Sequence, residues 1–356
     1  MTVTGNLYVS QDLPDKTGKL KFYYDKDIPL SSSLIEYYDS IISGWNSIYT
    51  TMHSRFGKEL QANETQTGAT LGSDIYVLIS RRLSEIDPDL AGFFYSGDLY
   101  PPDRLTNGIS NQLKIFYLNL RESENALTLD IMKSTMAHEF QHMIFYSNRI
   151  RNGVTSDDAW LNETLSAFAE SACGFSVANK NNQSKAIQMQ AYFDAMNRVP
   201  LVQDDGWGSN AQYGQVALFG EWFAEEYETS VSALKKLYAS KKTGMAAVEE
   251  VTGKSFETIF SQWMLAMYLD MPGSIYGFDT LDWKEYDFPG LAPITLTGPI
   301  QANKGNLIAD AYLPSSSITL MPMSCYMIRF AGGGNSEALD FSMQPGSEVT
   351  VFELGK

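Results

Sequence analysis

Two of the three histidines in the chain lie four residues apart, in the segment His138-Glu139-Phe140-Gln141-His142. On a helix, residues at positions i and i+4 share one face, so both imidazoles can point at a single metal ion. The carboxylate of Glu139 lies beside them and can reach a metal-bound water as a general base. This H-E-x-x-H pattern predicts a metal site suited to hydrolysis. The alternative is a helix whose two histidines only pack in the core or face solvent.

A third ligand is predicted on a second helix. Residues 160–172 carry apolar side chains at a helical period, and Glu163 lies among them, with twenty residues between it and His142. A catalytic zinc site uses three protein ligands and keeps one position open for water, and two histidines with one glutamate are a common set. We therefore expect His138, His142 and Glu163 to hold Zn²⁺. The alternative for Glu163 is a solvated position on the helix.

The two segments resemble those of the gluzincin zinc metallopeptidases, in which an H-E-x-x-H helix precedes a second helix with an Asn-Glu pair. Within this group the chain is most similar to the hyicolysin family of bacterial secreted neutral metallopeptidases. The resemblance implies an α+β fold of the zincin (thermolysin-like) type, with an N-terminal mixed-sheet lobe, an active-site helix, a helical lower lobe and a small C-terminal β domain. It covers roughly residues 70 to 270. The resembling segments are Ala91–Phe94, Asn111–Leu120, His138–Ile144, Trp160–Ser166, Tyr213–Gly214 and Leu218–Phe219.

The sequence departs from the thermolysin pattern behind the ligands. Thermolysin-like enzymes carry an aspartate four residues after the ligand glutamate, where it orients a zinc histidine, and this position is Ala167 here. Zinc histidines nearly always need such an acceptor. Glu170, two turns along the same helix face from Glu163, is the expected substitute, with an exposed helix acid as the alternative. Asn162 is the other residue that we expect to support the ligands.

Two further roles are implied by the resemblance. Tyr213 lies where related enzymes place a tyrosine that donates to the oxyanion formed during hydrolysis, although among twenty tyrosines it can equally be a packing residue. The strand with Gly92, Phe93 and Phe94 lies where these enzymes have an open sheet edge, to which an extended peptide adds by main-chain hydrogen bonds. An ordinary core strand is the alternative for this segment.

The resemblance favours an endopeptidase acting on a protein or peptide substrate. The aminopeptidase branch carries a Gly-x-Met-Glu-Asn strand, and no such pentapeptide occurs in this chain. Three alternatives stay open: an aminopeptidase, a glycoprotein-directed gluzincin that cleaves beside O-linked sugars, and a binding protein in which zinc is only structural. Substrate preference and oligomeric state are not readable from one sequence.

The apolar pattern predicts the elements that must position these residues. Strands are expected at 20–24, 74–80, 91–95 and 114–120. Helices are expected at 31–56, from a cap at Thr128 through the H-E-x-x-H segment, and at 186–197, 213–227, 231–239 and 255–270. The loop between the two zinc helices is expected at 149–155, with Gly153 in a turn and Ser156 or Asp157 as the N-cap of the second helix.

These elements divide the chain into three parts. Residues 1–127 form the N-terminal sheet lobe, residues 128–270 the zinc helices and helical lobe, and residues 271–356 a C-terminal β domain with short alternating stretches. The β domain is either a scaffold or an accessory that binds substrate or glycan. Cys173 and Cys325 have no metal-ligand spacing, and either a pair or two free thiols is consistent with the sequence.

Charge and hydropathy exclude two classes of partner. The chain of 356 residues has a formal net charge of −16, which argues against nucleic acid and anionic membrane surfaces. No apolar run approaches the length of a membrane span. The first residues, Met1–Gly5, lack the basic and apolar regions of a signal peptide. The resemblance implies a secreted or cell-surface protein, whose export signal would then be absent from this chain.

Overall fold

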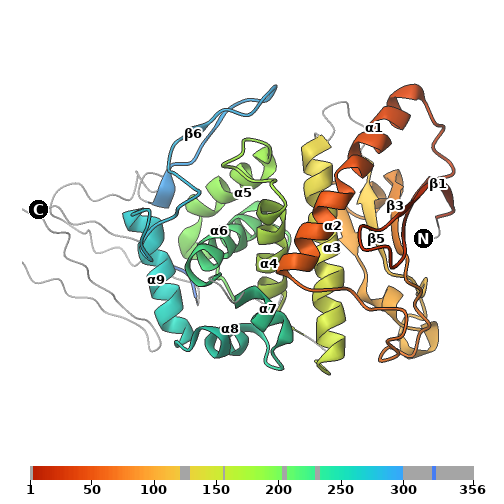
Figure 1. Ribbon diagram of the computed structural model, residues 1–356. Coiled ribbons are helices and arrows are strands. Elements are labelled where there is room, and N and C mark those ends of the chain that lie inside the picture. Colours follow the sequence, from red (N-terminus) through yellow and green to blue (C-terminus); the bar gives the residue numbers. More distant parts are fainter. Residues whose placement is uncertain are drawn as a thin grey trace, which may run out of the picture.

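The computed structural model describes residues 3–120, 129–154, 157–202, 207–228, 233–299 and 323–325. Within these ranges the fold is mixed α+β, with a mixed sheet followed by a helical region (Figure 1). The strands are β1 (Gly5–Asp12), β2 (Lys19–Asp25), β3 (Ile75–Ser80), β4 (Gly92–Phe94), β5 (Ile115–Asn119), β6 (Glu285–Tyr286) and β7 (Ile294–Thr295). The helices are α1 (Ser32–Ser43), α2 (Trp45–Arg55), α3 (Leu129–Arg151), α4 (Ala159–Ala172), α5 (Gln183–Phe193), α6 (Asn210–Tyr227), α7 (Ala233–Ala239), α8 (Gly244–Thr252) and α9 (Phe256–Leu269).

The main sheet has five strands in the order β1-β2-β3-β5-β4. Strands β2, β3 and β5 are parallel, whereas β1 and β4 run antiparallel to their neighbours and lie at the two edges. Alternation along the strands sends one set of side chains to the helix-covered face. Phe22, Val77 and Phe116 are in register across the three central strands, and all are fully buried. This row forms the core beneath the helices.

Helix α3 lies between the sheet lobe and the helical lobe (Figure 1). On the sheet side, its Phe140 ring packs 5.0 Å from the ring centroid of Trp45 in α2. Trp45 in turn contacts Phe116 of β5, with ring centroids 6.3 Å apart. On the other side, α3 packs against α4. A buried helix fixed on both sides is a rigid support for the two histidines that it carries.

The helical lobe is packed tightly at two glycines of α6. A Cβ atom at Gly214 would lie 1.9 Å from the carbonyl oxygen of Gln188 in α5. A Cβ atom at Gly220 would lie 2.9 Å from the carbonyl oxygen of Thr164 in α4. Both positions exclude any side chain, so the backbones of α5 and α4 lie directly on α6. This packing fixes the helix that carries Glu163.

Several element predictions are confirmed. Strands 74–80, 91–95 and 114–120 correspond to β3, β4 and β5, and the predicted later helices correspond to α5, α6, α7 and α9. Ser255 caps α9 by accepting the backbone N–H of Thr258, and Gly253 ends α8 with φ 70. The predicted turn at Gly153 has φ 71. The cap at Thr128 and the N-cap candidate Ser156 lie outside the described residues.

Other element predictions are wrong in detail. The helix predicted at 31–56 is two helices, because a tight turn at Gly44 breaks the hydrogen-bond ladder between α1 and α2. The loop predicted to begin at Arg149 begins three residues later, since α3 continues through Arg151. The N-cap of α4 is Asp158 and not Asp157. Strand β1 and helix α8 were not predicted.

The C-terminal part of the chain is described only up to residue 299 and at Met323–Cys325. In the described part, β6 and β7 form an antiparallel pair, and the remaining predicted strands lie outside the described residues. The Met323 carbonyl accepts the backbone N–H of Leu201, which fixes the short segment beside the helical lobe. Cys173 and Cys325 are both free thiols.

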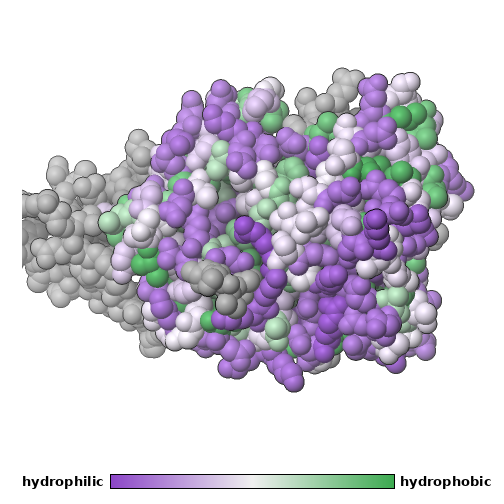
Figure 2. All heavy atoms as spheres, viewed as in Figure 1, coloured by the Kyte–Doolittle hydropathy of each residue, from purple (hydrophilic) through white to green (hydrophobic). Residues whose placement is uncertain are grey.

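The described surface is largely polar on the side that Figure 2 shows. Figure 2 shows a face dominated by hydrophilic residues, on which the hydrophobic ones are scattered. None of the helices described is long and apolar enough to span a bilayer.

Candidate metal centre

The predicted ligands come together where α3 faces α4. The Nε2 atom of His138 lies 3.3 Å from Oε2 of Glu163, and Nε2 of His142 lies 3.6 Å from Oε1 of the same carboxylate. One ligand atom from each residue lies within 4.8 Å of the others. The two imidazole planes stand nearly perpendicular, at 86°. Helical spacing on α3 and the packing of α4 thus produce a three-ligand cluster.

The geometry of this cluster fits a tetrahedral metal ion. Zinc with ligand bonds of about 2.0–2.1 Å would hold neighbouring ligand atoms roughly 3.4 Å apart. The two nitrogen–oxygen separations, 3.3 Å to Oε2 and 3.6 Å to Oε1 of Glu163, are close to that spacing, and one ligand atom from each residue lies within 4.8 Å of the others. Oε2 of Glu163 is buried, and the Nε2 atom of His138 at 3.3 Å approaches it without the geometry of a full hydrogen bond. A buried carboxylate oxygen without a full hydrogen bond is costly, and a cation between the three side chains would satisfy it.

His138 is held from behind by a buried carboxylate. Its Nδ1 lies 2.9 Å from Oε1 of Glu170, which leaves Nε2 free to face Glu163. Glu170 also accepts hydrogen bonds from Ser134, at 2.5 Å, and from Asn182, at 2.9 Å. An N–H from Nδ1 to a carboxylate fixes the tautomer and the ring orientation of a metal-ligating histidine. Glu170 therefore makes the contact with His138 that was expected of it in place of an aspartate at position 167.

A buried lysine balances the charge of Glu170. The Nζ atom of Lys185 in α5 lies 3.0 Å from Oε1 of Glu170, and both side chains are 8% exposed. Burial would raise the pKa of Glu170, but the charge of Lys185 and the hydrogen bond to His138 lower it to about 2. The carboxylate is thus ionised over the whole physiological range.

His142 has a separate, uncharged support. Its Nδ1 lies 3.0 Å from Oδ1 of Asn162 and 3.0 Å from Oγ of Ser166. The Ser166 hydroxyl donates to Oε1 of Gln141, whose amide donates to the hydroxyl of Tyr238 at 2.6 Å. All four supporting residues are buried. This chain of hydrogen bonds fixes the ring of His142 with its Nε2 toward Glu163.

Burial and charge act in opposite directions on the pKa values of the two imidazoles. Burial lowers the pKa of His142 to about 4. Burial would also lower the pKa of His138, but its hydrogen bonds to Glu163 and Glu170 raise it to about 10. The charge of a divalent ion is the usual way to neutralise several carboxylates gathered around imidazoles. The donor set of two nitrogens and one carboxylate suits Zn²⁺.

Glu139 is a residue of α3 whose side chain contacts strand β4. Its carboxylate accepts the backbone N–H of Phe94, and the residue is 5% exposed. Burial raises its pKa to about 8, with the charge of His138 opposing this rise. A Cβ atom at Gly92 would lie 3.1 Å from Cγ of Glu139 and 2.6 Å from Cγ2 of Thr135, so the glycine lets β4 lie directly on α3. Gly92 and Phe94 therefore help to position Glu139.

Strand β4 is the edge strand of the sheet that contacts α3, the helix that carries His138 and His142. Phe93 points to the other face of the strand and stacks on Tyr117 of β5, with ring centroids 5.0 Å apart. Phe94 contacts Tyr146 of α3, with ring centroids 5.8 Å apart. The predicted substrate residues thus lie on an edge strand next to Glu139.

Tyr213 lies in the first turn of α6, after a capping box made by Ser209 and Gln212. The negative charge of Glu163, together with burial and the charge of Glu139, raises the pKa of the Tyr213 hydroxyl above its usual value. The phenol therefore remains protonated and able to donate a hydrogen bond near these two carboxylates. The edge of its ring packs against Trp207, 6.3 Å away.

Sequence reasoning missed several residues that hydrogen-bond or ion-pair with the side chains behind the two histidines. Lys185 and Asn182 reach Glu170 because α5 and α4 both pack on α6, and Ser134 reaches it from α3. Ser166 follows Glu163 by three residues, and this helical spacing is a signal that could have identified it. The third histidine, His53, lies 2.7 Å from Glu59 in a separate buried cluster.

The chain gives no match to models of known protein families, and it gives none to curated protein sequences.

Proposed function

We propose that this protein is a zinc-dependent endopeptidase of the gluzincin type. The single observation that carries the proposal is the convergence of His138, His142 and Glu163 beside Glu139. Two imidazole nitrogens face one carboxylate at tetrahedral spacing, each imidazole is fixed from behind, and an acid lies next to them on the same helix. Three protein ligands are the number that a catalytic zinc site uses. A thermolysin-like zincin fold is consistent with the mixed sheet, its antiparallel edge strand and the two adjacent helices.

In this proposal His138, His142 and Glu163 hold the ion, and Glu170 and Asn162 keep the two imidazoles oriented. When bound, Zn²⁺ supplies polarisation of the scissile carbonyl and a lower pKa for the attacking water. Glu139, whose raised pKa the charge of the ion would lower again, accepts the proton of that water and delivers it to the leaving amine. Its bond to the Phe94 amide holds the carboxylate at the edge of the sheet. Tyr213, protonated at neutral pH, donates to the oxygen that becomes negative.

The substrate would lie along β4 as an extended chain. A peptide that pairs with an edge strand satisfies backbone N–H and C=O groups of both chains. Because the first residue of β4 is Gly92 and its last, Phe94, donates to Glu139, this edge brings a bound backbone next to the proposed base. The preference for cleavage within a chain rests on the absence of the Gly-x-Met-Glu-Asn strand of the aminopeptidases from this sequence.

The test is the substitution Glu139→Gln. Glutamine keeps the size of the side chain and can still accept the Phe94 N–H, so we expect an unchanged fold and one zinc ion per chain. Loss of the base should lower kcat on casein by about 10²- to 10⁴-fold. The control Glu36→Gln removes an exposed acid on α1 and should behave as wild type. Wild-type turnover in Glu139→Gln would show that the base has been assigned incorrectly.

A further inference from the structure

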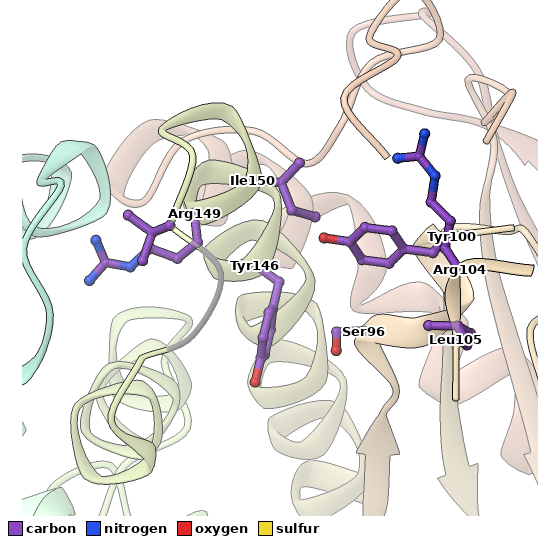
Figure 3. A pocket seen from close by; sticks show the side chains of 8 residues that line it. Ser96, Tyr100, Arg104, Leu105, Tyr146, Arg149 and Ile150 are labelled. Carbon is purple, nitrogen blue, oxygen red and sulfur yellow. The ribbon is translucent and has the colours of Figure 1, made fainter. Parts of the chain in front are cut away.

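A cavity opens beside the metal ligands, between the end of α3 and the segment that follows β4. Its volume is about 220 Å³, and its lining includes Ser96, Tyr100, Arg104, Leu105, Tyr146 and Ile150. A water molecule occupies about 30 Å³ in the liquid, so there is room for one side chain of moderate size. Tyr146 and Ile150 come from α3, and the other four come from the segment after the strand (Figure 3).

The cavity lies one helical turn from the proposed active site. Tyr146 follows His142 by one helical turn, which places it on the same face of α3. The charge of Glu163 contributes, after burial, to the raised pKa of Tyr146, in keeping with this proximity. Ser96 lies two residues after the end of β4. A peptide along β4 would therefore bring one of its side chains to the mouth of this cavity.

Arg104 gives the cavity a positive charge. Its guanidinium lies on the backbone of Gly68, where a Cβ atom would be 2.7 Å from the guanidinium carbon. Gly68 has φ +80, which glycine adopts without strain, so the loop can lie beneath the arginine. Among the described residues no acidic partner is recorded for Arg104. In contrast, the buried Arg149 pairs with Asp157, and Figure 3 shows its side chain directed away from the cavity.

Hydroxyl groups complete the polar lining. The ring of Tyr100 reaches across the cavity toward Ile150, and Ser96 lies below it (Figure 3). The positive charge of Arg104 opposes the effect of burial on the pKa of Tyr100, so the two groups lie near each other. No side-chain hydrogen bond is recorded within the described residues for the hydroxyls of Ser96, Tyr100 or Tyr146. These donors are thus available to a ligand.

We infer that this cavity is a specificity subsite that takes an acidic side chain of the peptide substrate. The carboxylate would lie between the Arg104 guanidinium and the hydroxyl of Tyr100 (Figure 3). The methylene groups would lie against Leu105 and Ile150. A guanidinium and hydroxyls are suited to a carboxylate, because every one of them can donate to it. The match is notable in a chain of net charge −16, whose field would otherwise disfavour an acidic substrate.

This inference rests on the proposed peptidase activity, and the experiment separates the two. The zinc-loaded wild type is incubated with a peptide library varied at each position around the cleaved bond, and the products are mapped by mass spectrometry. We expect one position to favour Glu and Asp over Gln and Asn by about tenfold in kcat/KM, since one charge-assisted contact to a partly exposed arginine is of this order.

Arg104→Gln should remove the preference by slowing the Glu peptide while the Gln peptide is cleaved as before. Arg104→Lys should keep part of it, because lysine retains the charge but not the planar fork. The control Lys26→Gln removes an exposed cation that does not line the cavity and should keep the full preference. Cleavage with no acidic preference at any position, or a preference that survives Arg104→Gln, would overturn the subsite while leaving the peptidase intact. No cleavage of any library peptide would overturn the proposed activity and this inference with it.

Discussion

Replacement of Glu170 by glutamine should damage the metal centre and the fold through two separable effects. The carboxylate bonds to Nδ1 of His138 and forms a buried ion pair with Lys185, at distances of 2.9 and 3.0 Å. Replacing the carboxylate behind a ligating histidine by a neutral amide weakens metal affinity by about 10- to 100-fold. Loss of one member of a buried pair leaves the other charge uncompensated, which costs about 3–5 kcal/mol. Glu170→Gln should therefore show both losses.

The double variant Glu170→Gln/Lys185→Met separates the two effects. Removing both charges takes away the unpaired ammonium, so most of the lost free energy of unfolding should return. The carboxylate behind His138 remains replaced by a neutral amide, which is a weaker acceptor, so zinc affinity should stay about 10- to 100-fold weaker than in the wild type. Urea unfolding with a chelator present measures the first quantity, and competition against a chromophoric zinc chelator measures the second.

Each result has a clear contrary outcome. Wild-type zinc affinity in Glu170→Gln would refute the role of this carboxylate behind His138. A double variant no more stable than Glu170→Gln would show that the buried charge of Lys185 is not the source of the instability. The ion pair would then contribute nothing beyond packing.

Two further predictions concern the edge strand and the sheet lobe. Gly92→Ala would place a methyl group 2.6 to 3.1 Å from atoms of α3 and β5. It should displace Glu139 and lower kcat by roughly 10²-fold while zinc is retained. The control is Gly72→Ala, whose added Cβ has no atom within 4 Å, and equal turnover in the two variants would contradict the role of Gly92. For acid stability, burial would raise the pKa of Glu59, but His53 and Lys114 lower it below 4.5. The contribution of Glu59 to the free energy of unfolding is complete above pH 4.5 and is lost as the pH falls through the lower pKa of the folded state. Glu59→Gln should therefore make the free energy of urea unfolding depend less on pH in this range. An unchanged pH dependence would contradict this role of Glu59.

The parts of the site that the sequence predicts are those set by local helical spacing. His138 and His142 share a face of α3 whatever lies around them, and Glu163 and Glu170 share a face of α4 for the same reason. Lys185 could not be assigned, because its contact with Glu170 exists only once α5 and α4 both pack on α6. The basic cavity was equally hidden, since its residues come from irregular segments after β4 and from α3.

The errors in the fold have similar causes. The helical pattern continues through Gly44, whose backbone keeps right-handed φ and ψ values, so the break between α1 and α2 leaves no mark in the periodicity. Strand β1 escaped prediction because it lies at the edge of the sheet and has little apolar alternation, with Leu7 51% exposed. Edge strands depend on pairing with a neighbour more than on their own pattern.

The most direct test of the central claim is zinc analysis combined with a cleavage assay on one preparation. The purified protein is analysed for metal and incubated with casein and with mucin, with and without a chelator. The account predicts one zinc ion per chain and cleavage that the chelator stops and added zinc restores. Cleavage of mucin but not casein would narrow the activity to glycoproteins. A protein that binds no zinc, or whose cleavage persists in the chelator, would contradict the assignment of His138, His142 and Glu163 as a catalytic metal centre.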